Sequence, residues 1–113
     1  MTIEDRDCKL CNGTGVRTIL GETHVCRACG GSGRRPAPDE AGLEEACRGR
    51  GGRLRSTRPR DDRAYYVWRM ARVRAGVDER IPVLAALLVY GDPFRPELDA
   101  LAERLAVAHL GGA

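Results

Sequence analysis

Two copies of one cysteine–glycine motif, C-x-x-C-x-G-x-G, constrain this 113-residue chain more than any other feature. The first copy covers Cys8–Gly15, and the second covers Cys26–Gly33, 18 residues further on. Two C-x-x-C pairs at this separation can fold back and place four thiolates around one ion, which is the ligand set of a tetrahedral structural zinc site. The sequence therefore predicts one zinc ion per chain, bound by Cys8, Cys11, Cys26 and Cys29.

The residues around the cysteines suit such a site. Two intervening residues let the chain curl until both sulfurs of a pair face one point, and zinc at ~2.3 Å from each sulfur closes the site. After each pair the chain must turn sharply while backbone N–H groups point at the sulfurs. Glycine adopts the necessary positive φ without a Cβ clash. The glycines expected to support the site in this way are Gly13, Gly15, Gly31 and Gly33.

The segment between the two copies is typical of a β-hairpin. Residues 16–20 and 23–25 are predicted to form short strands, with Gly21 and Glu22 at the turn. The hairpin would carry one knuckle at each end. His24, two residues before Cys26, is an alternative ligand, although a histidine at such a place is more often an exposed hairpin side chain.

Disulfide and redox chemistry are the alternatives to metal binding. Two disulfides would suit a secreted chain, but no secretory hydrophobic segment follows Met1, and a reducing cytosol favours metal. A redox C-x-x-C is expected beside a βαβ pattern, for which residues 1–35 are too short and too rich in glycine. The longest apolar run, Ile81–Tyr90, is too short to span a bilayer core of ~30 Å. We therefore expect a cytoplasmic protein that has no membrane partner.

A third, incomplete copy of the motif follows at the same period. Glu44 stands where the first cysteine would be, while Cys47, Gly49 and Gly51 keep the other three signature positions. The segment is either a decayed repeat or a chance match in a stretch rich in glycine and arginine. Cys47, the odd cysteine, is expected to be a free thiol or a partly buried small apolar residue on a short helix around residues 41–46.

Three zones are expected along the chain. Residues 1–35 form the zinc-binding knuckle, residues 36–61 a linker with the degenerate third repeat, and residues 62–113 a helical unit. The linker is rich in Pro, Gly and Arg, with six arginines and three glycines between Arg48 and Arg60. We expect that such a segment cannot bury enough apolar surface to order itself.

The helical zone is expected to hold three helices. The first would run from about residue 62 to Ala75, the second from Pro82 to Tyr90, and the third from Pro93 or Pro96 to Gly111. The second is apolar nearly all round, so it should be the buried helix in the middle. The predicted fold class is thus a small zinc-knuckle β-hairpin followed by an all-α, three-helix C-terminal unit.

The C-x-x-C-x-G-x-G repeat resembles that of the cysteine-rich zinc domain of DnaJ-type co-chaperones. In that family four repeats form two zinc sites on an extended β-hairpin scaffold that helps to handle unfolded polypeptide. This chain has two intact repeats, the stretch from the first to the last of them spans 26 of its 113 residues, and it lacks the His-Pro-Asp tripeptide of a J domain. The resemblance implies a zinc site at Cys8, Cys11, Cys26 and Cys29 and a polypeptide-binding surface, without stimulation of an ATPase chaperone.

Two groups of regulators share the reduced pattern in outline. Anti-TRAP, a small bacterial regulator, looks like one such knuckle followed by a helix, and it binds another protein. Late antiterminators of lambdoid phages also place a DnaJ-like cysteine motif near helical segments, and they act on DNA and RNA polymerase. The resemblance to either implies a regulatory role.

A protein-interaction module, chaperone-like or regulatory, is the function that the sequence favours. Its partner would be a protein or an unfolded polypeptide. A surplus of leucines in the helical zone makes a homo-oligomer through apolar helices a further option. An enzyme is not expected, because four cysteines leave zinc no open position and no catalytic set of Ser, His and Asp or of paired carboxylates stands out.

The alternative function is a nucleic-acid-associated transcription regulator. Its arginines would neutralise phosphates, so that affinity would fall steeply with salt. The formal net charge of only +3 and the absence of aromatic residues within the arginine run argue against it. The candidate nucleic-acid contacts are Arg48, Arg50, Arg53, Arg55, Arg58 and Arg60.

Overall fold

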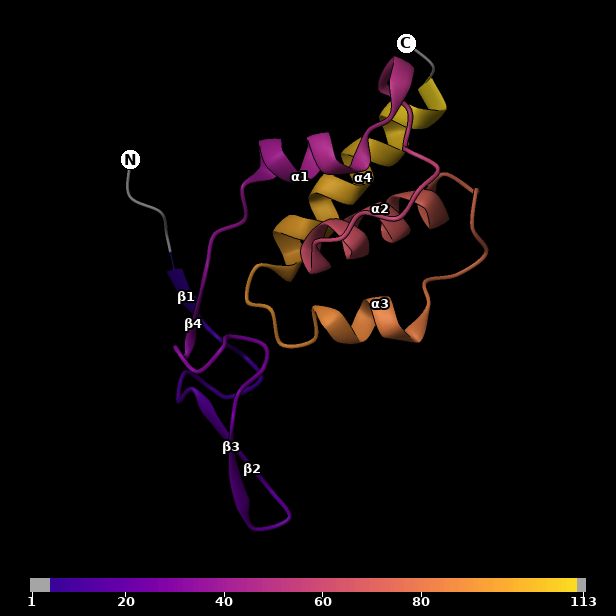
Figure 1. Ribbon diagram of the computed structural model, residues 1–113. Coiled ribbons are helices and arrows are strands. Elements are labelled where there is room, and N and C mark those ends of the chain that lie inside the picture. Colours follow the sequence, from indigo (N-terminus) through magenta and orange to yellow (C-terminus); the bar gives the residue numbers. More distant parts are fainter. Residues whose placement is uncertain (1–4, 112–113) are drawn as a thin grey trace. The chain divides into compact units, whose positions relative to one another are not determined.

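A computed structural model describes residues 5–111 of the chain (Figure 1). The strands come first and the helices follow. In chain order the elements are β1 (Asp5–Asp7), β2 (Val16–Ile19), β3 (Glu22–Val25), β4 (Arg34–Pro36), α1 (Glu40–Cys47), the 3-10 helix η1 (Arg50–Gly52), α2 (Asp62–Arg74), α3 (Val83–Leu88) and α4 (Arg95–Gly111). Strand hairpins followed by helices are as predicted, and four α-helices are present in this part of the chain. α2, α3 and α4 lie in the predicted helical zone, and α1 covers the short helix expected around residues 41–46.

The described residues form two compact units. The knuckle unit contains the residues up to Ala37 together with Tyr90–Arg95, and the helical unit contains Pro38–Val89 and the residues from Pro96 onward. The knuckle unit is therefore discontinuous in sequence. Within residues 5–111, none of the helices is both long enough and apolar enough to cross a membrane.

Two separate strand pairs build the knuckle unit. β2 and β3 pair antiparallel from Val16↔Val25 to Ile19↔Glu22, and β1 pairs antiparallel with β4. The predicted hairpin is confirmed, but its two-residue turn lies at Leu20 and Gly21, one residue earlier than expected, and Glu22 belongs to β3. Leu20 and Gly21 have φ of 52° and 81°. Every residue of β2 and β3 is exposed. The β1–β4 pair was outside the prediction, because strands of three residues that are all charged except Pro36 carry no alternating pattern.

The segment Tyr90–Arg95 completes the knuckle unit from far along the chain. The backbone N–H of Lys9 donates to the carbonyl of Gly91 at 2.9 Å. The Arg6 guanidinium lies 4.3 Å from the centroid of the Phe94 ring, a cation–π contact. The sequence assigns this segment to the helical zone, and the structure corrects that assignment.

The helical unit has its core around α2, which contacts both α1 and α3. The hydroxyl of Tyr66 on α2 also donates to the Asp99 carboxylate on α4 at 2.7 Å. One cluster of buried side chains joins all four helices. Its fully buried large members are Tyr66, Val67, Val89, Leu98, Leu101 and Leu105.

The middle helix is α2 and not α3. Only Ala85 of α3 is buried, whereas Val83, Leu84 and Leu87 are 56–75% exposed. The expected arrangement with residues 82–90 in the centre is therefore wrong. α3 has only six residues, while α2 buries aromatic side chains whose polar atoms find partners, as when Trp68 Nε1 donates to the Arg55 carbonyl at 2.8 Å.

The predicted linker is ordered. Asp39 caps α1 by accepting the Gly42 N–H at 3.2 Å, and Leu43, Cys47 and Leu54 belong to the core of the helical unit. Three well-placed apolar side chains suffice to anchor a segment that otherwise consists largely of Gly and Arg. The degenerate third repeat takes a helical form, since Glu44 and Cys47 lie on α1 and form no knuckle.

Candidate metal centre

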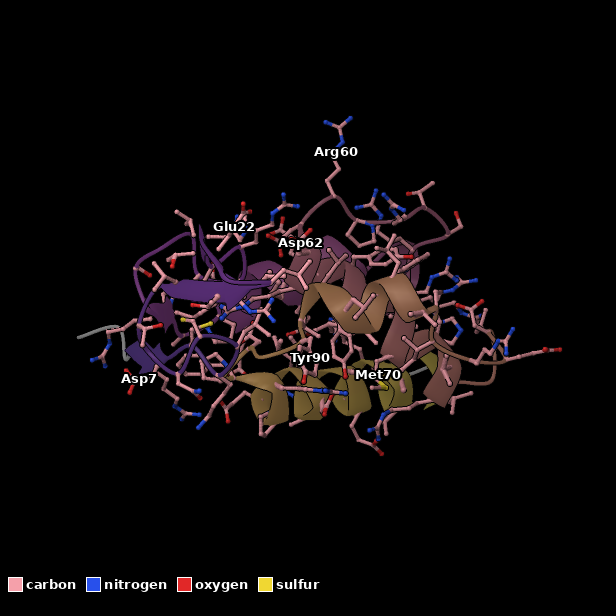
Figure 2. All side chains as sticks on the ribbon, turned by 90° about the horizontal axis from the view of Figure 1, so that it is seen from below. Asp7, Glu22, Arg60, Asp62, Met70 and Tyr90 are labelled. Atoms are coloured by element: carbon pink, nitrogen blue, oxygen red, sulfur yellow. The ribbon has the colours of Figure 1, made fainter. Side chains whose placement is uncertain are left out.

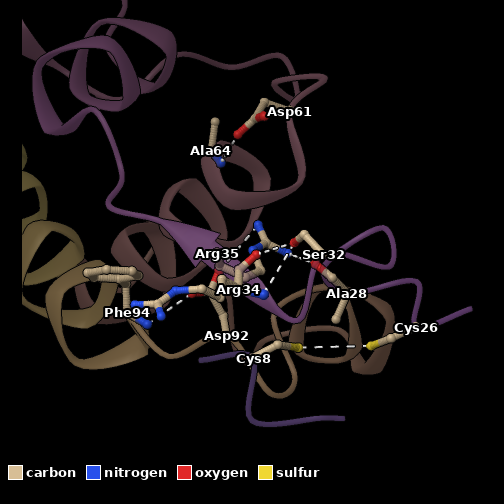
Figure 3. A network of polar contacts seen from close by, with 10 residues as sticks. All are labelled: Cys8, Cys26, Ala28, Ser32, Arg34, Arg35, Asp61, Ala64, Asp92 and Phe94. Carbon is tan, nitrogen blue, oxygen red and sulfur yellow. Dashed lines mark hydrogen bonds and ion pairs between the residues drawn. The ribbon is translucent and has the colours of Figure 1, made fainter. Parts of the chain in front are cut away.

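The four cysteine sulfurs of the two motif copies converge. One ligand atom from each of Cys8, Cys11, Cys26 and Cys29 lies within 4.8 Å of all the others, so that together they could hold a metal ion. The Cys8–Cys26 sulfurs are 3.9 Å apart (Figure 3), and the Cys11–Cys29 sulfurs are 3.7 Å apart. A regular tetrahedron with metal–sulfur bonds of ~2.3 Å has edges of about 3.8 Å. The cluster therefore has the size of a four-thiolate site.

Disulfide bonding does not describe these cysteines. All are free thiols, and the sulfur separations far exceed the ~2.05 Å of a disulfide bond. Cys8 and Cys26 are fully buried, and Cys11 is 5% exposed. Cys29 is partly buried, and a set of four thiols such as this is the ligand chemistry that soft and borderline metal ions prefer.

Backbone amides donate to the sulfurs where the motif glycines turn the chain. The N–H of Gly15 donates to Cys11 Sγ at 3.2 Å, and the N–H of Gly33 donates to Cys29 Sγ at 3.3 Å. The φ angles of these two glycines are 80° and 76°. A Cβ on Gly15 would overlap the Gly31 carbonyl, so a side chain has no room there. These amides stabilise thiolate charge.

The two motif copies bind each other in a reciprocal way. The N–H of Cys8 donates to the carbonyl of Gly33 at 2.9 Å, and the N–H of Cys26 donates to the carbonyl of Gly15 at 2.9 Å. The first cysteine of each copy is thus bonded to the last glycine of the other. β2 and β3 connect the two knuckles in sequence, so the knuckles lie at the open end of the hairpin. The two reciprocal hydrogen bonds hold the knuckles together there.

Two hydroxyl side chains support the knuckles and were missed by sequence reasoning. Thr14 Oγ1 donates to the Cys11 carbonyl at 2.7 Å, and Ser32 Oγ donates to the Cys29 carbonyl at 3.0 Å. Each hydroxyl therefore closes the turn that follows a cysteine pair. The available signal was that both copies have a hydroxyl residue between their two glycines.

The environment of the sulfurs shifts their ionisation. Burial raises the pKa of Cys8 to about 11, against the opposing effect of the Cys11 and Leu10 amides. At Cys11 desolvation also acts to raise the pKa, but the Gly15 amide and the neighbouring thiols outweigh it and lower the pKa to about 6. A metal ion would displace the remaining thiol protons on binding, so metal affinity falls as pH falls.

The other candidate ligands lie elsewhere. His24 is exposed on β3, where its Nε2 lies 3.6 Å from a Glu22 carboxylate oxygen. Cys47 is fully buried in the core of the helical unit, and its thiol donates to the Ala64 carbonyl at 3.4 Å. Neither residue belongs to the four-sulfur cluster.

Three of the arginines suggested as nucleic-acid contacts have partners among the described residues. Arg48 pairs with Glu44 at 2.6 Å, Arg55 donates to the Ala46 carbonyl at 3.1 Å, and Arg58 lies 4.7 Å from the Tyr65 ring centroid.

Arg53 and Arg60 are exposed, and Arg60 points away from the ribbon (Figure 2). The side chain of Arg50 lies outside the described part of the structure. The run from Arg48 to Arg60 therefore combines side chains that stabilise the fold with others that face solvent.

Comparison with models of protein families, with curated proteins and with solved structures finds no match to this chain. The four-sulfur cluster is therefore the observation from which a function must be argued.

Proposed function

We propose that the chain binds one zinc ion through Cys8, Cys11, Cys26 and Cys29, and that the ion is structural. Sulfur separations of 3.7 and 3.9 Å fit a tetrahedral zinc site, and this single observation carries the proposal. Four thiolates fill the coordination sphere, so no position is left for a substrate or an activated water. The zinc would tie the two knuckles together, and catalysis is not part of the proposed function.

The function of the zinc-stabilised protein is, on this proposal, to bind another protein or an unfolded polypeptide, as a chaperone-like or regulatory module. Its support is the apolar surface that neither unit buries. Leu20 at the hairpin turn is 99% exposed, and Val83 and Leu87 on α3 are 75% and 60% exposed. Exposed aliphatic side chains that gather on one element are typical of interaction sites. The resemblance of the motif to the DnaJ-type zinc domain points the same way.

Native mass spectrometry of protein purified without chelator tests the zinc site. We expect one zinc per chain, loss of the metal in Cys26→Ser, and retention of it in the matched control Cys47→Ser. A metal-free mass that is lighter by the hydrogens of disulfide bonds would refute the zinc proposal. The same spectrum reports whether the chain forms the homo-oligomer through apolar helices.

Suppression of client aggregation tests the interaction function. Zinc-loaded protein is added to a chemically denatured client that is diluted into buffer, and light scattering is followed at low and moderate salt. We expect suppression that moderate salt leaves unchanged, because apolar contacts are not screened. Unchanged aggregation, together with failure to retain any cellular protein, would refute this function.

A further inference from the structure

The β2–β3 hairpin has a hollow on its surface that the zinc site does not use. Its volume is about 400 Å³, and it is lined by Arg17, Ile19, His24, Val25 and Arg27. The strand register sets Arg17 directly opposite His24. Because side chains alternate along a strand, Arg17 and Ile19 lie on the same face of the hairpin.

The lining of this hollow contains basic side chains and no acidic ones. It combines two arginines and a histidine with two aliphatic side chains. Glu22 is not among the lining residues, and its carboxylate lies 3.6 Å from His24 Nε2 with the side chain 79% exposed. Arginine forms its strongest hydrogen bonds with carboxylates, often through two parallel N–H donors. A ligand that offers a carboxylate next to an apolar group would match both parts of the lining.

The hairpin is also built to accept an extended chain. In the described part of the structure, β2 and β3 pair only with each other, so each strand has an unpaired outer edge. Unpaired strand edges bind extended peptides through backbone hydrogen bonds. Val25 is 63% exposed, and Leu20 holds a left-handed φ of 52° at the turn with its side chain wholly in solvent. None of the residues that the structure describes covers this leucine, whereas contact with a partner would bury it.

We propose that this hairpin surface binds an extended polypeptide segment in which acidic and apolar residues alternate. The carboxylates would pair with Arg17 and Arg27, and an apolar side chain would pack against Ile19, which shares the face of Arg17. This inference rests on the proposed protein-interaction function and specifies the partner by charge. It goes beyond general binding of unfolded chains, because it requires discrimination between acidic and basic segments.

Fluorescence anisotropy with zinc-loaded, full-length protein tests the inference. The probe is a short fluorescein-labelled peptide of alternating Glu and Leu, compared with peptides that alternate Lys and Leu or Glu and Ser. We expect binding of the Glu–Leu peptide only. Reversal of both hairpin charges, Arg17→Glu with Arg27→Glu, should weaken that binding at least about tenfold, because like charges then face each other.

The matched control carries the same charge change in the helical unit, Arg53→Glu with Arg60→Glu, and should bind the Glu–Leu peptide as the wild type does. Zinc content and far-UV circular dichroism check that the variants fold. Since Arg27 adjoins a cysteine ligand, Arg17→Glu alone serves if the double variant loses zinc, and weaker binding by it supports the inference.

Equal binding of the Lys–Leu peptide, equal loss in the control variant, or binding of an RNA oligonucleotide at the hairpin in place of the acidic peptide would overturn the inference. If the Glu–Leu peptide does not bind but client aggregation is still suppressed, the inference is wrong and the interaction function stands. If both measurements fail, both proposals are wrong.

Discussion

The carboxylate of Asp92 and the guanidinium of Arg35 form an ion pair at 3.5 Å, with side chains only 1% and 20% exposed (Figure 3). Asp92 lies between α3 and α4, and Arg35 lies on β4, directly after the second knuckle. The other Asp92 oxygen accepts the N–H of Phe94 at 2.9 Å, and Arg35 also donates to the Ala28 carbonyl. Through Arg35, a distant segment of the chain is thus linked to the backbone of the loop that carries Cys26 and Cys29.

Removal of the buried carboxylate should loosen the metal site. Asp92→Ala leaves the Arg35 charge without its partner, which we expect to destabilise the knuckle unit by about 2–3 kcal/mol. Zinc should then pass more quickly to a chromogenic chelator. The rate of transfer is measured by the absorbance of the zinc–chelator complex over time. Glu22→Ala, which removes an exposed carboxylate from the same unit, is the control and should leave the transfer rate unchanged. Equal rates for Asp92→Ala and the wild type would show that the pair does not support the site.

The backbone of Gly91 lies close to Leu10, so alanine at Gly91 can be compared with alanine at Gly76, which has no such neighbour among the described residues. Gly91 has φ of +82°, and an added Cβ would lie 2.7 Å from Cβ of Leu10 in the first knuckle. Gly76 has φ of +77°, but nothing lies within 4 Å of its added Cβ. Alanine at either position costs about 1–2 kcal/mol for the left-handed backbone, and Gly91→Ala should cost about 1–3 kcal/mol more.

Urea unfolding and zinc transfer, measured on both glycine variants, separate the two costs. We expect Gly91→Ala to speed zinc transfer and Gly76→Ala to leave the transfer rate unchanged. If the two variants behave alike, the contact with Leu10 is not a constraint on the knuckle unit.

What the sequence could predict of this fold was local. The spacing of Cys8, Cys11, Cys26 and Cys29 within one short stretch specifies the ligand set, and the hairpin follows from its strand-turn-strand composition. The Asp92–Arg35 pair could not be predicted, because it joins residues 57 positions apart and neither shows a pattern of its own. Long-range pairing of this kind is decided by packing and not by local preference.

In the helical unit, too, local sequence patterns do not predict which residues are buried. Residues 82–90 are the most apolar stretch of the chain, yet α3 is mostly exposed. Apolar composition predicts burial only when a large enough partner surface exists. In this unit α2 contributes the large buried side chains of the core, Tyr65, Tyr66 and Trp68. Likewise Leu54 of the predicted linker is buried in the core of the helical unit, and its N–H donates to His109 Nδ1 at 3.1 Å, a contact that no local pattern encodes.

Asp78 should make the helical unit sensitive to acid. Hydrogen bonds from Arg72 and then Arg69, opposed by desolvation, hold the pKa of Asp78 below its ordinary 3.8. A carboxylate with a lowered pKa stabilises the fold fully above its unfolded-state pKa, and the contribution is lost as pH falls through the folded-state value. Asp78→Asn should therefore cost about 1–2 kcal/mol at pH near 7. The difference from the wild type should shrink as the pH falls below 3.8, the ordinary pKa of the carboxyl, toward its lowered value in the folded protein.

Urea unfolding followed by Trp68 fluorescence at each pH measures this difference. Glu79→Gln, at the exposed neighbouring position, is the control and should show little difference at any pH. Wild type and variant are compared at the same pH, so acid release of metal affects both alike. A difference that widens as the pH falls would contradict the assigned role of Asp78.

Cys47 should not react with alkylating reagents in the folded protein. Burial raises the pKa of its thiol to about 12, so almost no thiolate exists near neutral pH. After chelation in native buffer, iodoacetamide should alkylate the four knuckle cysteines and leave Cys47 unmodified. Mass spectrometry of the alkylated protein counts the adducts, and a fifth adduct should form only in denaturant. Early modification of Cys47 would show that the core around α1 opens with the metal site.

Removal of the metal should unfold the knuckle unit while the helices persist. β2 and β3 are exposed along their whole length, so almost no apolar burial holds the hairpin in place. A structural zinc contributes about 10–16 kcal/mol of apparent binding free energy, which packing within this unit cannot replace. Hydrogen exchange before and after chelation should show loss of protection in the described residues up to Ala37 and also in Tyr90–Arg95, whose backbone is bonded to the first knuckle. The amides of α2 should keep their protection, because their core does not depend on the metal. Loss of the far-UV helical signal on chelation would contradict this prediction, and it would mean that the metal site stabilises the helical unit as well.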